Sequence, residues 1–154
     1  MVNKEEVYKD VVTYISELIE GKNNPSGVLC NVTAALHDAL PYYFWVGFYI
    51  VEDDTLQLGP FQGPVACFRI KKGRGVCGTS WAEAKTLIVP DVEQFPGHIA
   101  CSSLSRSEIV VPIIRNDEVI AVIDVDSKEL NSFDATDQKH LEQVAEILAN
   151  TSLL

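Results

Sequence analysis

The first forty residues alternate apolar and polar positions with the spacing of two amphipathic helices. In residues 4–20 the apolar side chains recur three and four positions apart, which places them on one stripe of a helix. Asn24 and Pro25 follow as an N-cap and a first-turn residue for a second helix. The same apolar spacing continues to Leu40, and Pro41 ends this helix because proline cannot continue it.

Beyond Pro41 the pattern changes to that of β-strands. Residues 43–51 are aromatic and β-branched, a composition that favours a strand, and the acidic residues 52–54 form a turn. Asn116 and Asp117 stand between two strongly apolar segments as a two-residue hairpin turn. The predicted strands are residues 43–51, 56–61, 65–70, 86–89, 108–115 and 118–126.

Two further helices and one long loop complete the pattern. A glycine-rich break at residues 73–75 precedes a short helix at 76–84, and Asp134 caps a final helix. Residues 91–107 form a long polar loop, and such a loop inside a compact domain is usually functional. Two helices, mostly antiparallel strands and a closing helix predict one α+β domain over residues 1–154.

Composition and charge narrow the choice of partners. The chain has 154 residues, of which 47% are hydrophobic and 22% charged, as in ordinary globular proteins. Its net charge of −10 opposes extended contact with nucleic acid and with anionic membranes. No apolar run approaches the roughly 20 residues of a bilayer span, and the charged N-terminus lacks the apolar core of a secretory signal. We therefore expect a cytoplasmic protein that binds neither nucleic acid nor membrane.

Four cysteines are the first candidates for chemistry. In a reducing compartment they are not a structural disulfide set, and their wide spacing does not match a zinc ribbon or finger. Cys30 lies on the apolar side of the second predicted helix, where we interpret it as a core residue. Cys67 falls on a predicted strand, Cys77 follows the glycine-rich break, and Cys101 lies in the polar loop, three residues after His98. Burial, metal ligation and redox chemistry all remain open for these three cysteines.

Carboxylates stand at the end of an apolar strand, where they are costly. Asp124 and Asp126 are two positions apart and therefore face the same side, and Glu108 begins the neighbouring strand. Two like charges on one face raise the pKa of one of them unless the strand end is solvated. Trp45 and Tyr49 are placed to wall such a pocket, although core packing explains each alone. Carboxylic acids beside a thiolate suit a reaction in which sulfur attacks while a proton is added.

Six short motifs carry a resemblance that covers most of the chain, from about residue 45 to the final helix. They are Ala66-Cys67, Gly73-x-Gly75-Val-Cys77-Gly-Thr79, Val89-Pro-Asp91-Val, Phe95-Pro-Gly-His-Ile-Ala-Cys101, Ser107-Glu-Ile-Val-Val-Pro112 and Val122-Ile-Asp-Val-Asp-Ser127. In this combination the chain resembles the free methionine-(R)-sulfoxide reductases, which are stand-alone GAF-domain enzymes. A GAF module that only senses a small molecule shares the strand pattern but has no reason to carry this cysteine set.

The resemblance implies a GAF-like α+β fold with a central antiparallel sheet, helices on one face and a ligand pocket under loops on the other. It implies reduction of the R-sulfoxide of free methionine without a metal or other cofactor, and it implies a homodimer. In this family a thiolate attacks the sulfoxide, and the resulting sulfenic acid condenses with a second cysteine to a disulfide. Thioredoxin then reduces the disulfide.

The family motifs also imply a role for each cysteine. Cys101 corresponds to the nucleophile and Cys67 to the main resolving cysteine, while Cys77 is a reserve partner or an alternative nucleophile. The competing hypothesis is a GAF sensor whose cysteines are structural or redox-sensing. Such a sensor needs an output domain, for which 154 residues leave no room, or a partner protein that supplies one.

The remaining implied roles concern substrate binding and proton transfer. Glu108 and Asp126 correspond to the groups that polarise and protonate the sulfoxide. Asp124 corresponds to the partner of the substrate ammonium, Trp45 contacts the S-methyl group, and Tyr49 walls the pocket.

Overall fold

The computed structural model describes residues 3–98, 101 and 103–151, which form four α-helices, one 3-10 helix and one sheet. The helices are α1 (Lys4–Ile19), α2 (Pro25–Ala39), α3 (Gly75–Glu83) and α4 (Ala135–Ala149), with the 3-10 helix η1 at Val92–Gln94. The strands are β1 (Trp45–Glu52), β2 (Thr55–Gln62), β3 (Arg69–Lys71), β4 (Leu87–Val89), β5 (Ser107–Arg115) and β6 (Glu118–Ser127). They pair antiparallel throughout, in the order β3-β2-β1-β6-β5-β4. The predicted α+β class and antiparallel sheet are confirmed.

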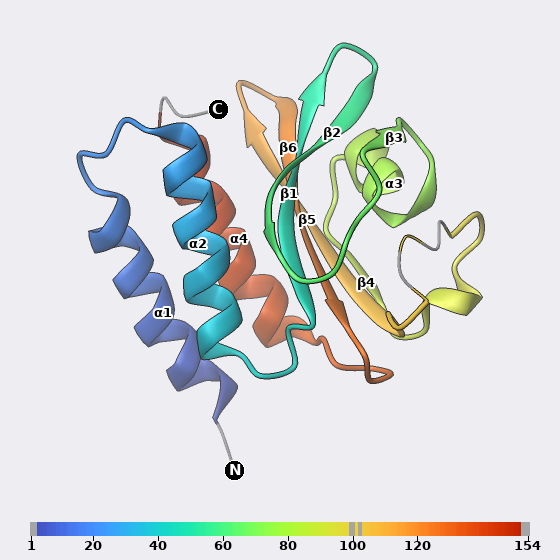
Figure 1. The fold of residues 1–154 in the computed structure, drawn as a ribbon, viewed down its shortest axis with the longest axis horizontal. Coiled ribbons are helices and arrows are strands. Elements are labelled where there is room, and N and C mark those ends of the chain that lie inside the picture. The colour runs from blue at the N-terminus through green and yellow to red at the C-terminus, as the bar shows by residue number, and fades with distance from the viewer. Residues whose placement is uncertain (1–2, 99–100, 102, 152–154) are drawn as a thin grey trace.

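The sheet separates two layers of different composition. Helices α1, α2 and α4 lie together on one face, and α3 lies on the other (Figure 1). The alternation of β1 divides its side chains accordingly, because successive residues of a strand point to opposite faces. Val46 and Phe48 join the main core under the three helices, whereas Trp45 and Tyr49 join a second core under α3.

Caps and turns form where the sequence predicts them. The side chain of Asn24 accepts a hydrogen bond from the backbone N–H of Gly27 and so caps α2. Asp134 begins α4 with a capping box. Asn116 and Asp117 have φ angles of 52° and 65°, the left-handed conformation that a tight β5–β6 hairpin requires. These local signals confirm the predicted boundaries of the second and last helices and of the hairpin.

The strand predicted at residues 65–70 is wrong in extent, because β3 has only three residues and starts later. Side chains of β1 bind the backbone of this segment from across the pocket. The Trp45 indole Nε1 donates to the carbonyl of Pro64 at 3.0 Å. The Tyr49 hydroxyl donates to the carbonyl of Cys67 at 2.9 Å. The carbonyl of Pro64, just before the predicted strand, and that of Cys67, within it, are thus bound by side chains, and Cys67 lies in the loop between β2 and β3 rather than on a strand.

The interpretation of Cys30 as a core residue is also wrong, because its side chain is exposed. The buried stripe of α2 passes through Leu29, Val32 and Leu36. Cys30 follows Leu29 and is therefore rotated by about 100° around the helix axis, away from that stripe. The apolar spacing located the helix correctly but not every residue of its buried face.

The predicted polar loop at residues 91–107 contains a short regular turn, a backbone hydrogen bond across its base and a backbone hydrogen bond to the sheet. Helix η1 begins after Asp91, whose side chain accepts from the N–H of Glu93 at 3.0 Å. The N–H of Val92 donates to the carbonyl of Arg106, and the N–H of Arg106 donates to the carbonyl of Ser127 on β6. Residues 99, 100 and 102 of this loop lie outside the described residues.

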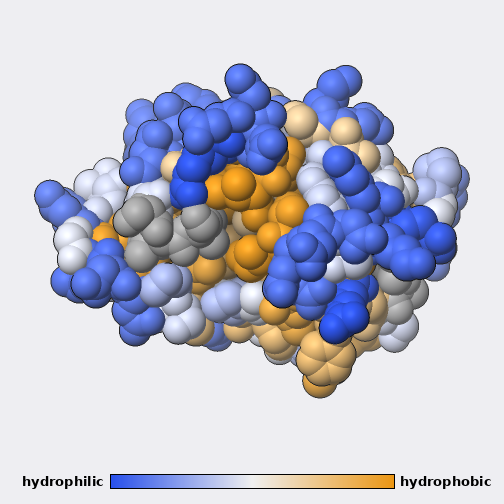
Figure 2. All heavy atoms as spheres, turned by 90° about the horizontal axis from the view of Figure 1, so that it is seen from above, coloured by the Kyte–Doolittle hydropathy of each residue, from blue (hydrophilic) through white to orange (hydrophobic). Residues whose placement is uncertain are grey.

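The surface carries hydrophilic residues around hydrophobic ones. Figure 2 shows one face on which polar and charged residues frame a central hydrophobic area. Within residues 3–98, 101 and 103–151, no helix has both the length and the apolar character needed to cross a membrane.

Candidate active site

The predicted site residues converge on one cavity on the face of the sheet that carries α3. Cys67 is the exception, since it does not line the cavity but is disulfide-bonded to Cys101, which does. The predicted residues that line it are Trp45, Tyr49, Cys77, Cys101, Glu108, Asp124 and Asp126. Residues from five separate segments of the chain are thereby assembled into one pocket.

An aromatic wall closes one side of the pocket. The ring of Trp45 is buried and stacks on Phe61 at 5.1 Å and on Tyr49 at 6.1 Å between ring centroids. Two glycines make room for the indole. A Cβ on Gly47 would lie 2.5 Å from Cη2 of Trp45, and a Cβ on Gly63 would lie 2.5 Å from its Cδ1. The backbone therefore clamps the indole in one orientation, which makes a rigid apolar surface.

Three carboxyl groups form the floor of the pocket. Glu108 on β5 pairs in register with Asp126 on β6, and Asp124 lies two residues before Asp126 on the same face. Glu108 and Asp124 are each only 6% exposed, and Asp126 is partly buried. The antiparallel register of β5 and β6 thus brings together acidic residues that stand 16 or more positions apart in the sequence.

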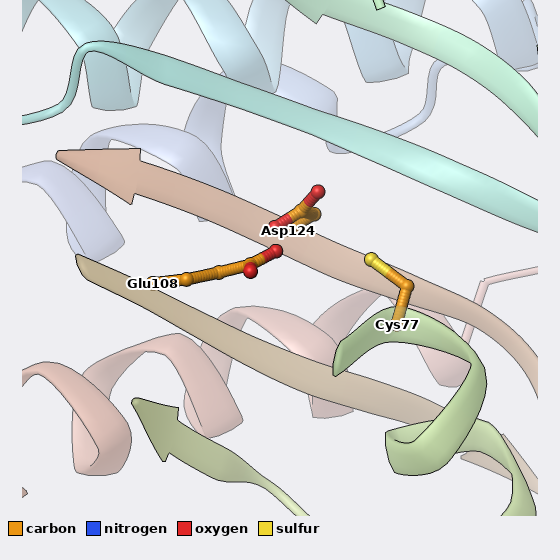
Figure 3. A group of neighbouring side chains, drawn as sticks. All are labelled: Cys77, Glu108 and Asp124. Atoms are coloured by element: carbon orange, nitrogen blue, oxygen red, sulfur yellow. The ribbon is translucent and has the colours of Figure 1, made fainter. Parts of the chain in front are cut away.

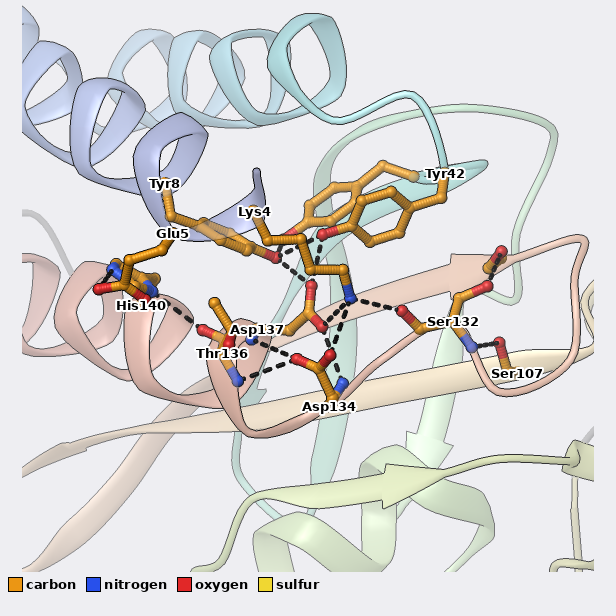
Figure 4. Close-up of polar contacts among 12 residues, drawn as sticks. Lys4, Glu5, Tyr8, Tyr42, Ser107, Ser132, Asp134, Thr136, Asp137 and His140 are labelled. Atoms are coloured by element: carbon orange, nitrogen blue, oxygen red, sulfur yellow. Dashed lines mark hydrogen bonds and ion pairs between the residues drawn. The ribbon is translucent and has the colours of Figure 1, made fainter. Parts of the chain in front are cut away.

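Hydroxyl groups fix the same strand ends from the opposite face (Figure 4). Ser107 on β5 donates to the carbonyl of Glu129 at 2.6 Å and accepts from the N–H of Ser132. Ser132 donates to the hydroxyl of Ser127 on β6 at 2.7 Å. Ser107 and Ser127 are the chain neighbours of Glu108 and Asp126, so this cluster holds the two carboxyls at a fixed separation.

Burial raises the pKa of all three carboxyls. For Glu108 and Asp126 the pKa lies well above the ordinary carboxyl range, because repulsion from Asp124 adds to burial. The rise in the pKa of Asp124 through burial is partly offset by hydrogen bonds with Glu108 and Cys77. Asp124 is therefore the carboxyl that ionises first, while Glu108 and Asp126 retain protons that a reacting group can take up.

One atom of this cluster is unsatisfied. Oδ1 of Asp124 is buried and has no hydrogen-bond partner in the described part of the chain. A buried acceptor without a donor costs about 1–3 kcal/mol, and more when it is charged. Proteins retain such groups where a ligand completes them, so the pocket is suited to a ligand that brings a donor or a positive charge.

The cysteines divide into a bonded pair and a buried thiol. Cys67 and Cys101 are 34 residues apart in the sequence and form a disulfide with a Cα–Cα distance of 5.4 Å. Cys77, at the start of α3, is free and buried. Burial, followed by the charges of Asp124 and Glu108, raises the pKa of Cys77 well above that of an ordinary thiol. Cys77 therefore keeps its proton, which disfavours it as a nucleophile.

Two basic residues of the cavity were not predicted as site residues. His98 lines the cavity, and burial lowers its pKa against the opposing charge of Asp124. Arg74 lines it from the N-cap of α3. The available signals were the position of His98 three residues before Cys101 and that of Arg74 between two glycines. Neither signal identifies a pocket without the fold.

Comparisons with known proteins agree on fold and family. A family model described as a GAF domain matches residues 25–151. GAF domain-containing protein A of Dictyostelium discoideum is 57% identical over 149 residues, which cover 96% of this chain and 94% of that protein. Free methionine-R-sulfoxide reductase of Escherichia coli K12 is 42% identical over 154 residues, which cover 97% of this chain and 93% of that protein.

The solved structures include the free methionine-R-sulfoxide reductase of Neisseria meningitidis in complex with its substrate. It superimposes with a TM-score of 0.94 at 46% identity, covering 97% of this chain and 90% of that one. The resemblance predicted from the motifs is thus confirmed over nearly the whole length. This chain belongs to the GAF-domain family of the free methionine-R-sulfoxide reductases.

Proposed function

We propose that this protein reduces the R-sulfoxide of free methionine to methionine with electrons from its own cysteines. The observation that carries the proposal is the placement of Cys101, bonded to Cys67, in one cavity with two buried carboxyls and a partly buried one. A sulfur nucleophile, a proton source and a second thiol are the three groups that this reaction needs. The reductases of Escherichia coli and Neisseria meningitidis support the choice of substrate.

The first step is attack by the Cys101 thiolate on the sulfur of the sulfoxide. Glu108 or Asp126 donates a proton to the sulfoxide oxygen as its bond to sulfur breaks, since both carboxyls have a raised pKa. The oxygen passes to Cys101, which becomes a sulfenic acid, and methionine leaves with its sulfur reduced. One thiolate, one sulfoxide and one proton thus yield one sulfenic acid and one thioether.

The second step closes the disulfide. The Cys67 thiol attacks the sulfenic sulfur of Cys101, the hydroxyl leaves as water, and the two cysteines become bonded. The Cα–Cα distance of 5.4 Å is within the ordinary range for a disulfide. A dithiol reductant of the thioredoxin type then restores both thiols by exchange. In this scheme Cys77 is a reserve partner.

Selection of the free amino acid follows from the polar and aromatic parts of the pocket. The ammonium group of methionine sulfoxide pairs with Asp124, whose Oδ1 has no partner among the described residues. The S-methyl group packs on Trp45, with Tyr49 behind it. A peptide or an N-acylated substrate lacks the ammonium and leaves the buried carboxylate unpaired.

The proposal includes a cytoplasmic location and a homodimer. Both rest on the similarity to the free methionine-R-sulfoxide reductases. The hydrophobic area framed by polar residues in Figure 2 supports an association surface of this kind.

The test is turnover of purified protein with each diastereomer of free methionine sulfoxide, a thioredoxin system and NADPH. We expect NADPH consumption with the R form and none above background with the S form. Cys101→Ser abolishes turnover, and Cys30→Ala, at an exposed cysteine, is the matched control that leaves it unchanged. Tight binding of the sulfoxide without turnover by the reduced wild type would favour a GAF sensor instead.

A further inference from the structure

Three potential metal ligands meet in the floor of the cavity. Sγ of Cys77 and one carboxylate oxygen each of Glu108 and Asp124 all lie within 4.8 Å of one another. They come from α3, β5 and β6, and Figure 3 shows the three side chains pointing toward one another. All three residues are buried, in contrast to the acidic clusters that protein surfaces commonly carry.

A second observation is an unsatisfied buried oxygen in the same cluster. Oδ1 of Asp124 is buried without a hydrogen-bond partner in the described ranges. None of the ion pairs between described residues involves Glu108 or Asp124. Two buried carboxyls and a thiol are thus held together without an ion pair to a described lysine or arginine.

We propose that this cluster binds a divalent transition metal ion of the Zn²⁺ type when no substrate occupies the cavity. Thiolate and carboxylate are both Zn²⁺ ligands, and one soft sulfur among oxygens selects against Mg²⁺ and Ca²⁺. Tetrahedral ligands at about 2.0–2.3 Å from zinc are about 3.5 Å apart, so the ligand atoms draw together by about 1 Å. On binding, Cys77 and Glu108, which both hold protons in the metal-free protein, lose them to the solvent.

The disulfide-bonded form of the protein can bind the ion. In the disulfide form Cys67 and Cys101 are bonded to each other, while Cys77 remains a free thiol. The oxidised protein therefore offers the complete set of three ligands. His98 lines the same cavity but is not one of the three clustered ligands, so water supplies the fourth ligand.

A metal ion in this cluster inhibits the proposed reaction. Only this consequence rests on the proposed function; the metal site itself does not. The ion takes Asp124, the partner of the substrate ammonium, and Glu108, a proton donor to the sulfoxide. Metal and methionine sulfoxide therefore exclude each other, and a Zn²⁺-type ion acts as a competitive inhibitor.

The experiment titrates Co²⁺ into oxidised, metal-free protein and follows the near-ultraviolet absorption of a cobalt–thiolate bond. We expect one ion per chain, displaced by Zn²⁺, with the same signal in the control Cys30→Ala. Cys77→Ala removes the thiolate absorption and weakens Zn²⁺ binding by about 100-fold or more, since even outer partners of a metal site contribute about 10–100-fold. Asp124→Asn weakens binding but keeps the absorption.

Two results would overturn the metal site. One is wild-type protein that binds no Co²⁺ or binds it without thiolate absorption. The other is Cys77→Ala protein that keeps the absorption. Circular dichroism establishes whether each variant is folded. If Cys77→Ala is not folded, Cys77→Ser, which is closer to cysteine in size, takes its place. Turnover assayed with a chelator present tests the reductase separately, so each proposal can fail without the other.

Discussion

The protein buries acidic residues on both faces of its sheet, and the two sites are satisfied in opposite ways. On the face with α1, α2 and α4, Asp137 is fully buried and its two oxygens are saturated (Figure 4). Oδ1 accepts from the hydroxyls of Tyr8 and Tyr42, each at 2.5 Å. Oδ2 accepts from Nζ of Lys4 at 2.7 Å and from the N–H of Asp134 at 2.8 Å. This carboxylate ties the start of α1 to the start of α4.

On the other face the carboxyls of Glu108, Asp124 and Asp126 have one another and a thiol as neighbours. Repulsion and burial raise the pKa of each, and one oxygen of Asp124 has no partner in the described part of the chain. Burial of an acid therefore does not by itself identify a functional site. What distinguishes the two regions is whether the fold supplies donors to the buried oxygens or leaves them for a ligand.

The largest expected effect is on catalysis, from Glu108→Gln. Removing a proton donor lowers kcat/KM by about 10²–10⁴-fold. The free energy of unfolding stays the same or increases, because a group whose ionisation is unfavourable in the folded protein is lost. Turnover and urea unfolding of the same preparation measure both. A variant that unfolds more easily but keeps its turnover would assign Glu108 to stability, like Asp137.

Asp137→Asn is expected to lower the free energy of unfolding and to leave turnover nearly unchanged, which is the reverse of the effect of Glu108→Gln. It breaks the ion pair with Lys4 and disturbs two tyrosine hydroxyls, at a cost of about 2–3 kcal/mol, less than for fully buried pairs because the Lys4 side chain is 28% exposed. Turnover per folded molecule stays within about twofold of wild type, because no ligand contact is lost. Asp134→Asn is the matched control, since that side chain is 62% exposed and asparagine caps a helix equally well. Lost turnover with unchanged stability in Asp137→Asn would contradict this division of the molecule.

Asp124→Asn tests whether the unsatisfied carboxylate of the pocket selects the free amino acid as substrate. Wild-type protein prefers free methionine sulfoxide over the N-acetyl form by about 100-fold or more, because the charged amine satisfies a buried carboxylate, a pairing worth about 3 kcal/mol. The variant lowers kcat/KM for the free amino acid and narrows this preference to about tenfold. The ratio of the two kcat/KM values measures the effect. An unchanged ratio would place the ammonium elsewhere.

A further effect is on the pH dependence of stability. Because the folded pKa of Glu108 is raised above its unfolded value, the folded state holds a proton that the unfolded state has lost above about pH 4. Glu108 therefore lowers stability progressively as the pH rises through this range, by at most about 1.4 kcal/mol per pH unit. Urea unfolding between pH 5 and 8 should show wild type losing stability relative to Glu108→Gln. The opposite trend would mean that Glu108 is an ionised carboxylate in the folded protein and that the fold stabilises its charge.

The features that the sequence predicted are mostly local. Asn24, Asp134 and the turn at Asn116 and Asp117 act within a few residues, so their patterns are readable without the fold. The strand at residues 65–70 was predicted too long, because the carbonyl of Cys67 within it binds the side chain of Tyr49 on β1, which is distant in sequence. Periodicity gives no indication of such a contact.

The features of the site also divide into those that the sequence predicts and those that only the fold shows. Asp124 and Asp126 share a face by their spacing, and the motifs brought Cys101 and Cys67 into one hypothesis. The environment of Asp137 had no signal at all, because its bond with Lys4 spans 133 positions of the sequence. The contrast between donor-rich and donor-poor carboxylates becomes visible only when the helices are packed on the sheet.

The most direct test of the central claim is a single turnover without external reductant, followed by mass spectrometry. Fully reduced protein is mixed with excess free methionine-R-sulfoxide, and released methionine and modified cysteines are quantified. We expect about one methionine per chain and a Cys67–Cys101 disulfide in wild type, and about one methionine with either an oxygen on Cys101 or a Cys77–Cys101 disulfide in Cys67→Ser. Release of methionine by Cys101→Ser protein, or an oxygen found on Cys77, would contradict the account.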